Sequence, residues 1–141
     1  MLDSILNPSS VPLLEQAAKF NERRHEVLVG NVANIDTPHY QRRDLDQDSF
    51  VDALRDAIAS RQPTPTRHYT PPAQPVRDQF AASLFEAREP DAVNVTFQDG
   101  AERSIETEIA ELTRTSLQQR FTIEVMAAQL ATLQAVIAES P

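Results

Sequence analysis

The residue types that most often bind metal ions or catalyse reactions do not cluster in this sequence. Its histidines stand at positions 25, 39 and 68, and none has the spacing of a metal-binding pair such as H-E-x-x-H. An acidic run over residues 44–56 lacks the central glycine and the glutamate at position twelve that an EF-hand calcium loop requires. We therefore expect solvent-facing histidines and helix-capping acids, with no metal site.

Catalysis finds no support either. No serine has a histidine or an oxyanion-hole glycine near it, and cysteine is absent. With only Gly30 and Gly100, the chain lacks the glycine-rich loops of P-loop and Rossmann sites. The sequon Asn94-Val95-Thr96 is a short pattern that also arises by chance. We predict no catalytic residue, no cofactor and no enzymatic activity.

Charge and hydropathy exclude two further classes of partner. The 13 basic and 21 acidic side chains give a net charge of −8, which disfavours nucleic acid as a partner. The longest uncharged stretch near the C-terminus, residues 125–138, is too short to cross a bilayer and is interrupted by glutamines, so no direct membrane span is expected. The N-terminus does not read as a secretory signal peptide, because it has no basic region before an apolar core.

Two segments have the periodicity of long helices. Residues 11–35 repeat by steps of three and four, which predicts a helix with a heptad-like stripe that polar residues interrupt. Residues 102–139 keep this period without a break, which predicts a longer helix that packs in register with another helix. From these two stripes we predict an assembly interface formed by Leu14, Leu28, Ile35, Ile105, Ile109, Leu112, Ile123, Met126, Leu130, Leu133 and Ile137.

The segment between these helices has a different composition. Residues 44–58 suggest a short amphipathic helix with acids at its N-terminal end, and residues 61–75 contain five prolines and read as an exposed loop. Residues 76–89 fit a helix weakly, and residues 93–97 alternate like a short strand. We predict a mainly α fold in one structural unit, divided into residues 1–43, 44–101 and 102–141, with the two terminal helices pairing as a coiled-coil-like layer.

A polar corner lies where the first helix should end, in the stretch NVANIDTPHYQRRD. Asn31 and Asn34 occupy the side of the helix where apolar residues are expected, and Thr37-Pro38 then stops the helix. One interpretation is simple helix termination. The other is a packed polar corner, in which a buried asparagine fixes the register between helices. Physical reasoning alone leaves these two interpretations equal.

The same stretch resembles the N-terminal signature of the bacterial flagellar rod and hook proteins, N-x-A-N-x-x-T-P-G-Y. Six positions match: Asn31, Ala33, Asn34, Thr37, Pro38 and Tyr40. The start MLDSI and the segment from Asp99 to Ile137 extend the resemblance to nearly the whole chain. His39 departs from the pattern, which usually has glycine there, and so do residues 101–104; Phe121 replaces an expected tyrosine.

The resemblance implies a structural subunit of the proximal rod of the flagellar basal body, in the periplasmic space. Such subunits are exported by the flagellar type III apparatus without a cleaved signal peptide, assemble helically through their terminal helices, and are needed for motility. The implied partners are further copies of the chain, rod proteins of the FlgC, FlgF and FlgG types, FliE, and the export gate and MS ring. The alternative is a cytoplasmic coiled-coil adaptor or export chaperone, since the heptads suit that role as well.

Overall fold

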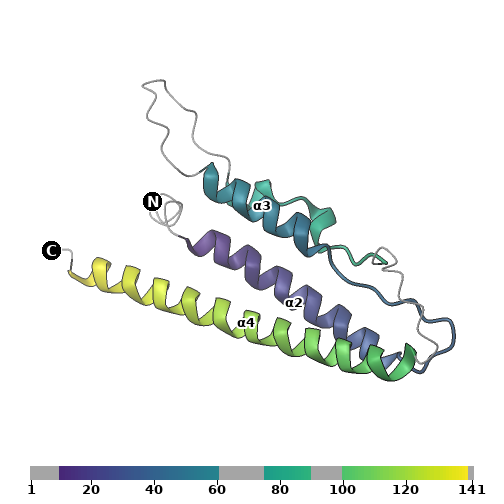
Figure 1. Cartoon of the computed structure of the whole chain (residues 1–141). Coiled ribbons are helices and arrows are strands. Elements are labelled where there is room, and N and C mark those ends of the chain that lie inside the picture. The colour runs from purple at the N-terminus through teal and green to yellow at the C-terminus, as the bar shows by residue number, and fades with distance from the viewer. Residues whose placement is uncertain (1–9, 61–74, 90–99, 140–141) are drawn as a thin grey trace.

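Three helices lie side by side in the computed structural model, which describes residues 10–60, 75–89 and 100–139. Helix α2 (Val11–Ala33) lies between α3 (Gln47–Ala59) and the long α4 (Gly100–Glu139), as Figure 1 shows. Two short 3-10 helices, η1 (Val76–Gln79) and η2 (Ala82–Phe85), accompany α3. In these ranges the structure has no strand, only an isolated antiparallel bridge between Asp44 and Arg88. The predicted mainly α fold, with terminal helices packed together, is confirmed.

The helix boundaries follow the signals in the sequence closely. Helix α2 starts after Ser10, whose carbonyl accepts the amides of Leu13 and Leu14, and Pro12 lies in its first turn. It ends two residues before the predicted limit at 35. The weak helical pattern over 76–89 resolves into the two 3-10 helices instead of one α-helix. The expected strand at 93–97 and nearly all of the expected loop at 61–75 lie outside the described residues.

The short amphipathic helix after the polar corner is present as α3. Asp46 is its N-cap, and the Asp46 carboxylate accepts hydrogen bonds from the Ser49 amide at 2.9 Å and the Ser49 hydroxyl at 2.6 Å. These bonds lower the pKa of Asp46 below its ordinary value. The expected capping role is therefore confirmed for Asp46, whereas Asp44 pairs with Arg24 instead.

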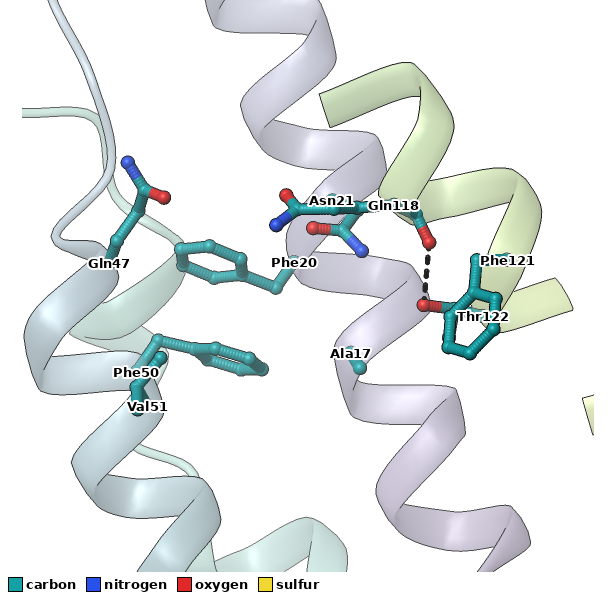
Figure 2. Close-up of a pocket in the computed structure, with 9 residues that line it drawn as sticks. All are labelled: Ala17, Phe20, Asn21, Gln47, Phe50, Val51, Gln118, Phe121 and Thr122. Carbon is teal, nitrogen blue, oxygen red and sulfur yellow. Dashed lines mark hydrogen bonds between the residues drawn. The ribbon is translucent and has the colours of Figure 1, made fainter. Parts of the chain in front are cut away.

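The hydrophobic core lies between α2 and the α3 side of the molecule. The Phe20 ring stacks on the Phe50 ring with centroids 4.0 Å apart, and Phe80 lies 5.5 Å from Phe50 (Figure 2 shows the Phe20–Phe50 pair). The buried cluster consists of Leu13, Phe20, Leu45, Phe50, Ala57, Val76 and Phe80. None of the described side chains of α4 belongs to this cluster. The apolar residues Leu13 and Phe20 of α2 thus pack against α3 and the two 3-10 helices.

The face of α4 that is buried in this subunit is polar. Glu108, Thr115 and Thr122 are the buried residues among the described side chains of α4, and they are spaced by seven. This spacing keeps one side of the helix against a neighbouring helix, as in a coiled coil. The predicted apolar stripe lies one position further along at each step, at Ile109, Ser116 and Ile123. Packing against α2 therefore leaves much of that stripe uncovered.

Replacing Phe50 with alanine should strongly destabilise the chain. Removing a buried aromatic ring from a core typically costs about 3–5 kcal/mol of unfolding free energy. Val51 is the matched control, because it is the next residue of α3 and is 39% exposed; Val51→Ala should change this free energy by less than about 0.5 kcal/mol. Urea unfolding followed by circular dichroism measures both. Equal effects of the two substitutions would place the core elsewhere.

Candidate functional site

Arg24 is a charged residue at the centre of the contact between α2 and α4. Its side chain is 2% exposed. Nε and Nη2 donate to the two carboxylate oxygens of Asp44, both at 2.9 Å, which is a bidentate pair. Nη2 also donates to Glu111 and Nη1 to the Thr115 hydroxyl, each at 2.9 Å. One guanidinium therefore joins α2, α4 and the segment that leads into α3.

The surroundings of Arg24 hold its positive charge in place. Burial on its own lowers the pKa of Arg24, but the hydrogen bonds and charges of Asp44 and Glu111 outweigh it and raise the pKa above its ordinary value. Two carboxylates thus compensate one buried cation. Loss of the cation would leave both carboxylates facing each other in a partly buried space.

Asn31 makes a second set of contacts, two helical turns further along α2. Its amide nitrogen donates to the Arg43 carbonyl at 2.7 Å and to Glu108 at 3.2 Å. Its amide oxygen accepts from the Tyr40 hydroxyl and the Arg43 amide, each at 3.1 Å. All donors and lone pairs of this buried amide are therefore used. Glu108, itself buried, also forms an ion pair with Arg42. We call the Arg24 and Asn31 contacts together the polar network.

Asn34 has a different role from Asn31. It is the C-cap of α2, and its side-chain nitrogen donates to the Gly30 carbonyl of the same helix at 2.8 Å. Its own carbonyl accepts from the Thr37 amide at 2.9 Å, and the Thr37 carbonyl accepts from the Tyr40 amide at 3.1 Å. The two interpretations left open by the sequence therefore apply to different residues. Asn34 terminates the helix, and Asn31 forms the packed corner.

His39 stands in the turn between these two asparagines and Tyr40. Its φ is 62°, in the left-handed region, and it is the one residue other than glycine with a positive φ in the described part of the chain. A side chain is strained there, whereas glycine is not. The rod and hook pattern has glycine at this position, so the backbone adopts a conformation that suits the pattern even though the residue departs from it.

The side chains of the polar network are hydrogen-bonded to one another. Every buried side-chain nitrogen or oxygen in the described residues has a hydrogen-bond partner. A small pocket of about 100 Å³ lies beside Asn31 and is lined by Ile35, Tyr40, Arg42 and Glu108. Its charged groups are paired with each other. In the part of the chain that the structure describes, no three His, Asp or Glu side chains gather as metal ligands would.

Comparison with known proteins gives a consistent result. No protein-family model matches the chain. The flagellar basal body rod protein FlgB of Escherichia coli (strain K12) is 29% identical over 97% of both chains, and that of Salmonella typhimurium is 28% identical over 97% of both. The same protein of Aquifex aeolicus is 54% identical over 35 residues, which are 25% of this chain and 28% of that protein.

The chain is similar to the FlgB rod proteins over nearly its full length. The resemblance seen in the signature motif is thereby confirmed. The six signature residues lie together at the end of α2 and in the turn that follows it. Asn31 is buried, Asn34 and Tyr40 are half-buried, and Ala33, Thr37 and Pro38 are exposed.

The residues predicted for assembly fall into three groups by exposure. Leu28 is fully buried inside the subunit. The four most exposed are Ile109 at 49%, Ile123 at 46%, Leu130 at 39% and Ile137 at 55%. The half-buried ones are Leu14, Ile35, Ile105, Leu112, Met126 and Leu133. The structure thus exposes half of the eight predicted α4 residues and partly buries the other half, while Leu28 belongs to the interior.

Sequence reasoning missed most of the polar network. In the sequence, Arg24 is one of the polar residues that interrupt the first helical stripe. Its partners Asp44, Glu111 and Thr115 belong to no recognised sequence motif. A usable signal was present in the spacing: Arg24 and Asn31 are seven apart, as are Glu108 and Thr115. Polar residues that share a heptad position on two antiparallel helices can meet across the contact.

Helix α4 also has the length and hydropathy that a membrane-spanning helix requires. Within Ile105–Ala138, an 18-residue window with a mean hydropathy of 1.5 is long and apolar enough to cross a membrane by length and composition, and 6% of that window is buried. The uncharged run over residues 125–138, from which no span was expected, is only the last part of this helix. The same composition suits a helix that other protein covers.

Replacing Arg24 with methionine should destabilise the packing of α4 on α2. Removing one partner of a buried ion pair typically costs about 3–5 kcal/mol of unfolding free energy, because the remaining charges stay buried without compensation. Arg23→Met is the matched control, since Arg23 neighbours Arg24 but pairs with Glu26 at the exposed surface. Its effect should be within about 0.5 kcal/mol. Similar values for the two variants would contradict a structural role for the network.

The strain at His39 can be tested with three variants. His39→Val should lower the unfolding free energy by about 1 kcal/mol or more, because a β-branched residue fits the left-handed region poorly. His39→Gly should leave this free energy equal to or above that of the original chain. Gln41→Val, at an exposed position two residues on, controls for the added valine. Thermal unfolding gives the ranking, and a tolerated valine at 39 would show that this backbone is not left-handed.

Proposed function

We propose that this chain is a structural subunit of the proximal rod of the bacterial flagellar basal body. The observation that carries the proposal is the similarity to FlgB rod proteins over 97% of both chains. The proposal extends to export through the flagellar type III apparatus without a cleaved signal peptide and to assembly in the periplasmic space. In this role the chain is required for flagellum assembly and motility, and it performs no enzymatic reaction.

The exposed surface of α4 supports a subunit that completes its packing in an assembly. Of the ten large exposed hydrophobic side chains in the described residues, seven belong to α4. Apolar side chains gathered on one helix usually mark a surface that meets other protein. The seven are Ile109, Leu117, Phe121, Ile123, Leu130, Val136 and Ile137.

The polar network fixes the position of α4 relative to α2, which a subunit with a defined assembly surface requires. Arg24 and Asn31 each bind both α4 and the segment 40–44, so they set the position of α4 along α2 and the point at which the chain turns away. A polar contact of this kind fixes register more strictly than apolar contacts do. The subunit can therefore present the exposed α4 stripe in a defined position.

The partners of the proposed subunit follow from the resemblance. They are further copies of the chain in the rod, rod proteins of the FlgC, FlgF and FlgG types, FliE, and the export gate and MS ring. Contacts between different surfaces of identical subunits build an open helix when the rotation does not close. A rod built from this chain requires contacts of that type.

Substitution of Leu130 with aspartate tests the role of α4. Leu130 is 39% exposed, so Leu130→Asp should change the unfolding free energy by no more than about 0.5 kcal/mol. In a strain lacking the native gene, this variant should fail to restore swimming and should be absent from purified basal bodies, because a charge would be buried without a partner in the assembly. Val29→Asp, at a 43% exposed position on α2, is the control and should restore swimming.

Two outcomes would contradict the proposal. Normal swimming with Leu130→Asp would show that this part of α4 does not contact other subunits. Presence of the original chain in the cytoplasm of cells with a working export gate, and its absence from basal bodies, would favour a cytoplasmic adaptor or export chaperone instead. A blocked export gate should retain the chain inside the cell if it is an exported subunit.

A further inference from the structure

A groove opens where α2, α3 and α4 meet. It has a volume of about 210 Å³, and α2 contributes Ala17, Phe20 and Asn21, α3 contributes Gln47, Phe50 and Val51, and α4 contributes Gln118, Phe121 and Thr122. Figure 2 shows the Phe20 and Phe50 rings facing each other, with Phe121 on the α4 side. Phe121 is 68% exposed. The groove therefore has an aromatic floor, polar uncharged edges and one exposed ring.

The second feature is the end of α4 beyond α2. Asn31 meets Glu108 and Arg24 meets Thr115, so the two helices run antiparallel, and α4 continues past the start of α2 (Figure 1). Residues 125–138 carry no charge. Leu130, Leu133 and Ile137 follow one another by three and four positions, the spacing with which a helix places anchors into a groove. We call residues 125–138 the α4 end.

The α4 end cannot fill the groove of its own chain. Thr122, at the edge of the groove, and Leu130 belong to the same unbroken helix. Leu130 therefore lies about 12 Å further along the axis, at 1.5 Å per residue. If the groove binds a helix of this kind, that helix must belong to another molecule.

Charge favours a second copy of this chain as that occupant. Two copies with a net charge of −8 each repel one another wherever acids meet. The groove has no charged residue among its nine lining residues, and the α4 end has none along its length. These two neutral surfaces can approach without placing acid against acid. The aromatic floor offers Leu130, Leu133 or Ile137 an apolar contact.

We infer that the groove between α2, α3 and α4 receives the α4 end of a neighbouring copy. The contact joins two different surfaces, so each copy keeps a free groove and a free α4 end, and the assembly remains open. One helix segment of about 21 Å covers less than a standard interface of roughly 1,600 Å², so a single contact is weak and repetition strengthens it. The inference rests on the proposed function and names the surfaces through which the subunits meet.

Disulfide cross-linking tests this contact directly, because the chain contains no cysteine. Purified Val51→Cys is mixed at high concentration with Leu130→Cys, Leu133→Cys or Ile137→Cys and then oxidised. At least one mixture should form a disulfide dimer about tenfold faster than either variant alone, since proximity accelerates the reaction. Ala135→Cys, on the opposite side of the α4 end, is the first control. Arg23→Cys, away from the groove on α2, replaces Val51→Cys in the second.

Each other result would overturn the inference. Faster dimer formation by Leu130→Cys alone would show that two α4 ends pair with each other. Equal rates with Ala135→Cys or Arg23→Cys would show random collision, and no dimer in any mixture would show that the groove stays unoccupied. The outcome is separable from the proposed function, because incorporation of the chain into basal bodies is measured independently. A chain found in the rod without this cross-link refutes the contact alone.

Discussion

The buried guanidinium of Arg24 is the interaction on which the arrangement of the terminal helices depends. A cation in a protein interior is tolerated only with compensating charge and hydrogen bonds. Arg24 obtains them from Asp44, Glu111 and Thr115, which belong to two other parts of the chain. Any displacement of α4 along α2 would separate these groups. The position of α4 is therefore set by a requirement for charge compensation, and apolar contact alone would set it less strictly.

Helix α2 divides its length between two kinds of contact. Its first half carries Leu13 and Phe20 and builds the hydrophobic core with Phe50 and Phe80 of the neighbouring elements. Its second half carries Arg24 and Asn31 and binds α4 through polar contacts. Because α4 turns Glu108 and Thr115 toward these residues, its apolar side chains contribute little to the interior of the subunit.

The consequence for function lies in what remains exposed. Because Glu108, Thr115 and Thr122 are the buried ones among the described side chains of α4, Ile109 and Ile123, one position further along, stay exposed. The signature residues contribute at the other end of α2, where Asn31 and Tyr40 secure the turn that takes the chain away from the helix. The similarity to FlgB rod proteins supports the proposal that this surface meets neighbouring subunits in a rod.

The sequence by itself determined the helices, because their signals are local. The signals are the proline in the first turn of α2, Thr37-Pro38 after its end, Asp46 before α3 and the unbroken period of α4, and each acts over a few residues. The signature at 31–40 also pointed, without any structure, to the rod proteins to which the chain is similar. The weak pattern at 76–89 was the exception, since tertiary contacts at Val76 and Phe80 decided its form. Only the tertiary structure decided which face of α4 meets α2 and which partner each asparagine binds. Those outcomes depend on pairing between residues up to 91 positions apart, such as Arg24 and Thr115, and a periodicity along one helix carries no information about the charge that faces it from another.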